Sequence, residues 1–230
     1  MAGINGPKIV TDKLNVCFDA ADRKSYTGSG ATVFRDLSGN NKNGSIIDSA
    51  TFSGTNGGEL YCNMGYIDMG NPITNSTYSL TAMSFCIWLK IPSSQPWGGS
   101  KNICVSSNAG ATFGLNMRYD TSNNLSFEIK RSTGDTAGVW STFIFDTIFN
   151  IVGTYDGSYI RMYVNGSEIG SGTSWSGTIH NNANSFTIGG WSNDYSAMRA
   201  YLYNVMIYNK ALSSTEVLQN FNAVRRRFSI

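Results

Sequence analysis

The stretch that decides the fold is residues 149–169, FNIVGTYDGSYIRMYVNGSEI. It contains Asp156-Gly157 and Asn165-Gly166, two dipeptides favoured in two-residue hairpin turns because both tolerate positive φ angles. Strand-like residues flank each dipeptide. The stretch therefore predicts an antiparallel meander in which 149–155 pairs with 158–164, and 158–164 pairs with 167–169.

Alternation of apolar and polar residues extends this pattern over most of the chain. In the run 85–91, Phe85 and Ile87 lie on one face, and Cys86 and Trp88 lie on the other. A period of two is typical of strands with two different faces. Further strands are expected over 14–18, 113–119, 125–129, 185–189 and 200–208. About twelve short strands at regular spacing predict an all-β fold, an antiparallel β-sandwich or jelly roll.

One segment near the C-terminus has helical spacing instead. Ser213 and Glu216 form a capping box, with Ser213 as the N-cap. Val217 and Phe221 follow on one face, so we expect one short C-terminal α-helix. The arginines at 225–227 then complement the negative end of that helix, in preference to a nucleic-acid arm, which needs a longer basic run.

The predicted organisation is an extended N-terminal arm over 1–12 and one domain over 13–230. Pro7 and the glycines near it place the arm outside the core. Such an arm can dock on another subunit by adding a strand to a sheet edge.

The composition excludes several classes of protein. Only 14% of the residues are charged, 13% are aromatic, and the net charge is +2. Disordered chains combine high net charge with few aromatics, so disorder is excluded. The scarcity of glutamate argues against a helix bundle, and no apolar run reaches the ~18 residues of a membrane span. The small net charge gives no field for binding nucleic acid.

Four cysteines, Cys17, Cys62, Cys86 and Cys104, are widely spaced, and His180 is the single histidine. These spacings do not build a zinc site, so buried free thiols are expected. The N-terminus lacks the basic and apolar regions of a secretory signal peptide. Synthesis in the cytosol is therefore expected.

Four motifs of this sequence resemble those of one family, the concanavalin A-like lectin/glucanase superfamily in its laminin-G-like form. They are 36–44 (DLSGNNKNG), 151–166 (IVGTYDG with RMYVNG), 186–190 (FTIGG) and 205–217 (VMIYNKALSSTEV). The resemblance covers most of 12–224 and implies a concanavalin A-like jelly roll.

Residues 14–44 also resemble a subgroup of this family that is common in tailed-phage genomes. This resemblance implies a non-enzymatic virion protein: a capsid decoration, fibre or attachment component, assembled in the host cytoplasm. The implied partners are other virion proteins, further copies of the chain and a host surface glycan. A free-standing carbohydrate-binding lectin is the first alternative, and a glycoside hydrolase is the second.

No catalytic residues are predicted. Glycosidases of the family carry paired glutamates on one strand, which places acid and nucleophile about 5 Å apart. This chain has only Glu59, Glu128, Glu168 and Glu216, and each is isolated in the sequence.

The resemblance also implies a candidate calcium site at Asp36 and Asn43, because many laminin-G-like domains hold calcium beside the early acidic loop. Calcium takes six to eight oxygen ligands. The family's acids in the last strand are replaced here by Tyr203 and Asn204, which weakens the site. No cofactor is required, and the alternative is that Asp36 satisfies backbone groups in a tight loop.

Sugar binding is expected to use aromatic residues in loops, since pyranose rings stack on such side chains. The candidates are Trp97, Trp175, Trp191, Asp194 and Tyr195. The alternative for each tryptophan is that it covers the end of the sandwich or contacts another subunit. Trp88 and Trp140 lie in strand-like runs and are expected in the core or on a sheet face.

Overall fold

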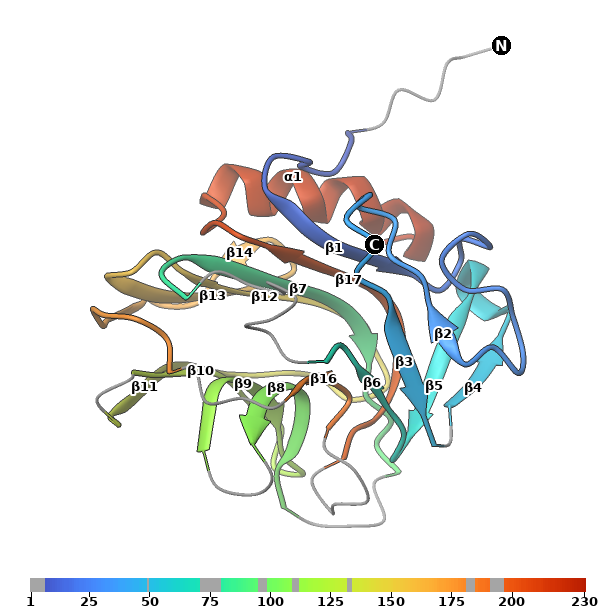
Figure 1. Cartoon of the computed structure of the whole chain (residues 1–230), viewed down its shortest axis with the longest axis horizontal. Coiled ribbons are helices and arrows are strands. Elements are labelled where there is room, and N and C mark those ends of the chain that lie inside the picture. The colour runs from blue at the N-terminus through green and yellow to red at the C-terminus, as the bar shows by residue number, and fades with distance from the viewer. Residues whose placement is uncertain are drawn as a thin grey trace.

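Two antiparallel sheets lie face to face in the computed structural model of the chain (Figure 1). The structure describes residues 7–48, 50–70, 80–94, 99–108, 112–131, 134–180, 185–190 and 197–230. This architecture confirms the predicted antiparallel β-sandwich, and the described residues contain one α-helix, α1, Ser214–Val224. None of the described helices is long and apolar enough to cross a membrane.

Sheet A has nine strands and runs in the order β14-β13-β12-β7-β17-β5-β4, with β1 also paired to β17 and β15 to β13. Its strands are β1 (Leu14–Asp19), β4 (Ala50–Ser53), β5 (Glu59–Asn63), β7 (Met83–Lys90), β12 (Ile148–Tyr155), β13 (Tyr159–Val164), β14 (Ser167–Glu168), β15 (Thr173–Ser174) and β17 (Arg199–Tyr208).

Sheet B has eight strands and runs in the order β11-β10-β9-β8-β16-β6-β3-β2. Its strands are β2 (Val33–Phe34), β3 (Gly44–Ile47), β6 (Tyr66–Asp68), β8 (Lys101–Asn108), β9 (Thr112–Tyr119), β10 (Asn124–Lys130), β11 (Thr136–Thr142) and β16 (Ser185–Ile188). Two short 3₁₀ helices, η1 (Thr55–Gly57) and η2 (Arg225–Phe228), complete the described structure.

The core lies between the sheets and follows the predicted alternation. Phe85 and Ile87 of β7 point into the main core and are fully buried. Cys86 and Trp88, on the other face of the same strand, are also fully buried. Sheet A is therefore covered on both faces, which explains how a strand of a sandwich can be apolar throughout.

Helix α1 covers the outer face of sheet A. Trp88 and Phe221 stack with their ring centroids 5.4 Å apart and their planes 4° apart. The predicted capping box is present: the Ser213 hydroxyl accepts from the Glu216 amide, and the Glu216 carboxylate accepts from the Ser213 amide. Val217, in the first turn, is fully buried beneath the helix.

The three arginines follow α1 directly, as the sequence suggested, and Arg225 is its C-cap residue, but they form a separate 3₁₀ helix. The α-helix ends at Val224, and the arginines belong to η2. There the Arg227 guanidinium forms an ion pair with Asp19 at 2.8 Å and donates to the carbonyl of Asn56. Arg227 thus joins the C-terminal segment to the loop after β1 instead of neutralising a helix end.

The two predicted hairpins are present, one with a longer loop. Asn165 and Gly166 have φ angles of 51° and 81°, as a two-residue turn between β13 and β14 requires. The other hairpin has a three-residue loop, because β13 begins at Tyr159 and not at Ser158. The Asp156 side chain accepts from the amides of Ser158 and Tyr159, which draws Ser158 into the turn.

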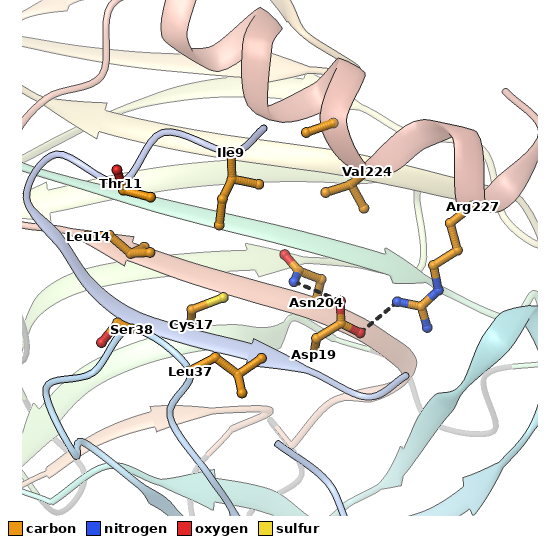
Figure 2. Close-up of a pocket in the computed structure, with 11 residues that line it drawn as sticks. Ile9, Thr11, Leu14, Cys17, Asp19, Leu37, Ser38, Asn204, Val224 and Arg227 are labelled. Carbon is orange, nitrogen blue, oxygen red and sulfur yellow. Dashed lines mark hydrogen bonds and ion pairs between the residues drawn. The ribbon is translucent and has the colours of Figure 1, made fainter. Parts of the chain in front are cut away.

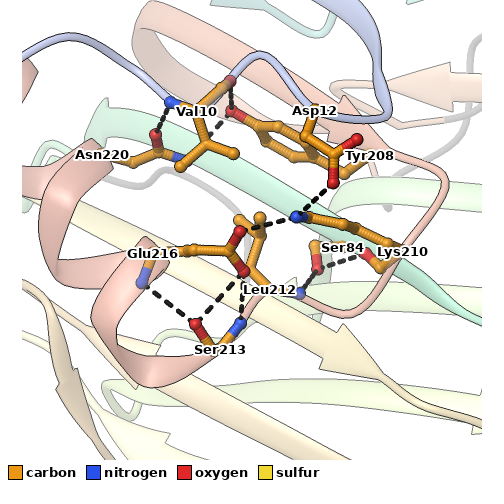
Figure 3. A network of polar contacts seen from close by, with 9 residues as sticks. All are labelled: Val10, Asp12, Ser84, Tyr208, Lys210, Leu212, Ser213, Glu216 and Asn220. Carbon is orange, nitrogen blue, oxygen red and sulfur yellow. Dashed lines mark hydrogen bonds and ion pairs between the residues drawn. The ribbon is translucent and has the colours of Figure 1, made fainter.

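Residues 7–12 pack against the domain through a polar network (Figure 3). The Val10 amide donates to Asn220 of α1, and the Tyr208 hydroxyl donates to the Val10 carbonyl. Lys210 bridges Asp12 and Glu216. Within the expected arm over 1–12, the described part therefore packs on the domain, since Val10 is buried against the helix. Residues 1–6 lie outside the described residues, so the arm as a whole stays a prediction.

Candidate functional site on the open sheet

The outer face of sheet B differs from that of sheet A, because α1 lies on the far side of the molecule (Figure 1). On strands β9, β10 and β11 the core residues include Met117, Phe127 and Val139. Since side chains alternate along a strand, their neighbours point outward. We define the open-face cluster as Asn116, Arg118, Ser126, Glu128 and Trp140.

The strand register arranges this cluster in two rows. Arg118, Ser126 and Trp140 lie directly opposite one another on the three strands. In the next row, Asn116 and Glu128 lie opposite each other, followed by Gly138. A Cβ atom at Gly138 would be 2.8 Å from Cγ of Glu128, so glycine leaves the room in which the glutamate side chain lies.

An ion pair fixes the centre of the cluster. Arg118 Nη2 lies 2.8 Å and Arg118 Nε 3.0 Å from Oε1 of Glu128. The Ser126 hydroxyl donates to the same oxygen at 2.8 Å. The Glu128 side chain is only 5% exposed, whereas that of Arg118 is 39% exposed. The buried carboxylate therefore holds the guanidinium in place at the surface.

One member of the cluster is exposed, and another carries a buried acceptor without a partner. Trp140 is 60% exposed, so most of its indole faces solvent. Asn116 is 6% exposed, yet its Oδ1 atom has no hydrogen-bond partner in the described structure. A buried acceptor without a partner costs about 1–3 kcal/mol. The site thus combines an exposed indole with a buried acceptor that has no partner.

A shallow cavity of about 200 Å³ lies at one end of the cluster. Its lining includes Arg118, Ser126 and Trp140, joined by Asp120 and Asn124. Burial raises the pKa of Asp120, but hydrogen bonds from Asn124 and Ser122 outweigh it and hold the pKa below its ordinary value. Asp120 is therefore an ionised acceptor at neutral pH.

Of the predicted sugar-binding residues, Trp175 lies within the described structure and is not a free platform. The Arg131 guanidinium lies 3.8 Å from the centre of its indole ring and covers one face. The rest of the side chain packs against the core. Trp97, Trp191, Asp194 and Tyr195 lie outside the described residues, so their role stays a prediction.

Trp140 was expected in the core or on a sheet face and not among the sugar-binding candidates. The alternation of Val139 inward and Trp140 outward was the signal that could have found it, since it places the indole on a sheet face. Trp88, which was also expected either in the core or on a sheet face, lies buried beneath α1.

The early loop does not fit the calcium site that the resemblance implied. Oδ1 of Asp36 accepts from the amides of Cys17 and Ser38, and Oδ2 accepts from the Ser38 hydroxyl and the Lys42 amide. Asn43 Oδ1 accepts from the Asp36 amide. These bonds use the oxygens that calcium would need. Among the described residues, no group of three or more metal-ligating side chains occurs.

The four glutamates lie on four different elements. Glu59 on β5 accepts from the Tyr203 hydroxyl at 3.0 Å, and Glu168 on β14 lies 3.4 Å from Arg161. Glu216 serves the helix cap. Glu128 is therefore the one glutamate on sheet B, and the paired arrangement of a glycosidase is not formed by glutamates.

Comparison with known proteins agrees with this architecture. A sequence model of the family described as the Concanavalin A-like lectin/glucanases superfamily matches residues 63–218. No curated protein matches the chain in sequence.

Similar folds occur in larger solved structures. Trypanosoma rangeli sialidase in complex with the inhibitor DANA has a TM-score of 0.73 at 16% identity, over 96% of this chain and 36% of the sialidase. The binding domain of Paraclostridial Mosquitocidal Protein 1 has a TM-score of 0.72 at 18% identity, over 93% of this chain and 52% of that one.

The botulinum neurotoxin serotype G binding domain has a TM-score of 0.69 at 13% identity, over 90% of this chain and 50% of that one. The chain thus spans about a third of the sialidase and about half of each toxin domain. At these identities the likeness shows the fold alone.

Proposed function

We propose that this chain, which belongs to the concanavalin A-like lectin/glucanases superfamily, binds a neutral glycan on the outer face of sheet B without cleaving it. The observation that carries the proposal is Trp140, an exposed indole beside a row of fixed polar groups. An apolar surface with a few convergent polar groups is the usual composition of a ligand site.

The chemistry of the open-face cluster suits a sugar. The Trp140 indole stacks on the C–H face of a pyranose ring, and the ring hydroxyls then reach the polar row. Asn116 Oδ1 is buried, so a sugar hydroxyl would satisfy this unpaired acceptor only after the side chain turns toward the surface. Arg118 is already paired with Glu128, and Asp120 adds a second negative charge. That balance favours a neutral glycan over an acidic one.

Binding without cleavage follows from the use of Glu128. Its Oε1 atom is engaged by Arg118 and Ser126, which makes it a support for the guanidinium. A retaining or inverting glycosidase needs a second carboxylate at a defined separation. The other three glutamates lie on sheet A or α1, and the nearby Asp120 carboxylate accepts from the Ser122 and Asn124 amides and from the Asn124 side chain in its own turn. Glu128 is thus a positioning residue in this proposal.

The test is a glycan array on the intact chain, followed by calorimetry with the best neutral glycan. Trp140→Ala should weaken binding by about tenfold or more, the loss expected for an aromatic anchor. Ile144→Ala is the matched control, because Ile144 is 72% exposed and does not line the cavity beside Trp140. Unchanged affinity in Trp140→Ala, or an array without neutral ligands, would overturn the proposal.

The same samples separate binding from hydrolysis. Incubation of the bound glycan with the wild-type chain should release no new reducing ends. Release that disappears in Glu128→Gln would instead establish a glycoside hydrolase. Glycan binding by the isolated chain is also the outcome expected of a free-standing lectin.

We further propose that this binding serves adhesion from a phage particle, where the chain would act as a decoration, fibre or attachment component beside other virion proteins and further copies of itself. The resemblance of residues 14–44 to phage-encoded domains supports this setting. Mass spectrometry of purified particles tests it: detection of the chain at a fixed copy number is expected, and its absence would refute the setting.

A further inference from the structure

A second cavity lies on the opposite side of the sandwich, between β1, β17 and the end of α1. It has a volume of about 490 Å³, within the range of small-molecule sites. Figure 2 shows Ile9 and Val224 on the helix side of the pocket and Leu37 beside β1. Leu14 and Ala223 complete an apolar wall. We call this cavity the helix-side pocket; the proposed glycan site does not use it.

The floor of the helix-side pocket carries an unsatisfied polar atom. Asn204 is 4% exposed, and its Nδ2 atom donates to the Phe18 carbonyl at 3.0 Å. Its Oδ1 atom has no hydrogen-bond partner in the described structure. In Figure 2 this oxygen points away from Asp19, toward Ile9. Rotating the Asn204 amide by half a turn would place its Oδ1 atom against the Phe18 carbonyl oxygen, and two acceptors would then face each other. The assignment of the amide oxygen and nitrogen is therefore fixed.

The cation beside this floor is already engaged. Arg227 pairs with Oδ1 of Asp19 and donates to the carbonyls of Asn56 and Gly58. The charge of Asp19 is thereby balanced, while its Oδ2 atom makes a long 3.5 Å contact with Asn204. On this floor the polar atom without a partner is therefore an acceptor, Asn204 Oδ1, and the neighbouring guanidinium disfavours a cationic head group.

We propose that the helix-side pocket binds a small neutral amphiphile with a hydroxyl head group and a short aliphatic body. The hydroxyl donates to Asn204 Oδ1, and the body packs against Ile9, Leu37 and Val224. The volume far exceeds the ~30 Å³ of one water, and the walls are mostly apolar. Burial of the body supplies the driving force, and the hydrogen bond selects the head group.

The test uses two isomers that differ in one donor. The ¹⁵N-labelled intact chain is titrated with 1-hexanol and with methyl pentyl ether, and the Asn204 side-chain amide and the Ala223 and Val224 backbone amides are followed by NMR. Hexanol should shift all three sites and bind about tenfold more tightly than the ether, the value of one well-placed hydrogen bond.

A filled pocket provides the second arm. Ala223→Phe places a ring in the cavity and should abolish the shifts, while Asn222→Phe, on the same helix but outside the lining, should keep them. Thermal melts check that both variants fold. Equal affinity for the two isomers, no shift with hexanol, or shifts that survive in a folded Ala223→Phe would each overturn the proposal.

This outcome is independent of the proposed glycan site. Trp140→Ala should leave hexanol binding unchanged, because Trp140 and Asn204 lie on different sheets.

Discussion

Asp36 shows how one side chain can organise a loop that resembles a metal site. Four hydrogen bonds converge on its carboxylate from β1 and from the loop itself. Charge-assisted bonds of this kind are stronger than bonds between neutral groups. The motif that suggested calcium therefore has a sufficient explanation in the backbone groups that it satisfies.

Removing this carboxylate should destabilise the fold whether or not calcium is present. Asp36→Ala should lower the free energy of unfolding by about 2 kcal/mol, because buried amides lose their acceptor. Chemical denaturation in calcium and in chelator measures it. Asp22→Ala is the control, since Asp22 accepts from Lys24 in an exposed turn and should cost less. Stabilisation of the wild type by calcium, absent in Asp36→Ala, would restore the metal site.

The helix cap is the element that ties the C-terminal segment to the sandwich. Burial raises the pKa of Glu216, but hydrogen bonds from Lys210 and Ser213 outweigh this and place the pKa below its ordinary value of 4.5. The folded state therefore favours the ionised carboxylate. Its contribution to stability is complete above pH 4.5 and is lost as the pH falls through the lowered pKa.

This linkage predicts that the loss of stability caused by Glu216→Gln, relative to the wild type, depends on pH. Glu216→Gln should melt at a lower temperature than the wild type at pH 7, and the difference should shrink toward pH 3. Ser213→Ala removes a neutral cap and should cost about 1 kcal/mol with much weaker pH dependence. Differential scanning calorimetry between pH 7 and pH 3 makes the comparison. A constant gap for Glu216→Gln across this range would refute the assigned ionisation.

Turns and helix caps that depend on contacts between residues close in the sequence could be predicted from it. The Asn165-Gly166 turn and the Ser213 cap depend on contacts within a few residues, and both are present. The boundary at Ser158 could not be predicted, because the Asp156 side chain competes for the backbone there. Position 156 alone does not reveal that competition.

The open-face cluster lay beyond sequence reasoning for a different reason. Arg118, Ser126 and Trp140 become neighbours only when the registers of three strands are known. A shift of one residue would turn any of them into the core. Similarly, the packing of Val10 on α1 joins residues 210 positions apart, which no local pattern encodes.

At the scale of the whole molecule, the four cysteines report on global unfolding. All four are free and buried, as the sequence predicted. Burial raises the pKa of Cys17 and of Cys62 to about 12, with nearby carboxylates adding to the effect at Cys17. Burial likewise raises the pKa of Cys86 and Cys104. The reactive thiolate is therefore scarce in the folded chain.

Thiol labelling should consequently be all or none. An aromatic disulfide reagent at pH 8 should label none of the four thiols rapidly in the folded chain and all four in guanidinium. Cys104→Ala should lower the denatured count to three without changing the native result. Rapid labelling of one thiol under native conditions would show that its segment opens locally.

Both ends of the described chain lie on the helix side of the sandwich, where Val10 packs on α1 and Phe228 contacts Trp88. Trp140 lies on the other sheet. A surface or a second domain joined at either end would therefore be attached to the helix side of the molecule, opposite the open face of sheet B. Copies anchored in this way would all present the indole outward, so that many weak contacts could act at once on a multivalent target.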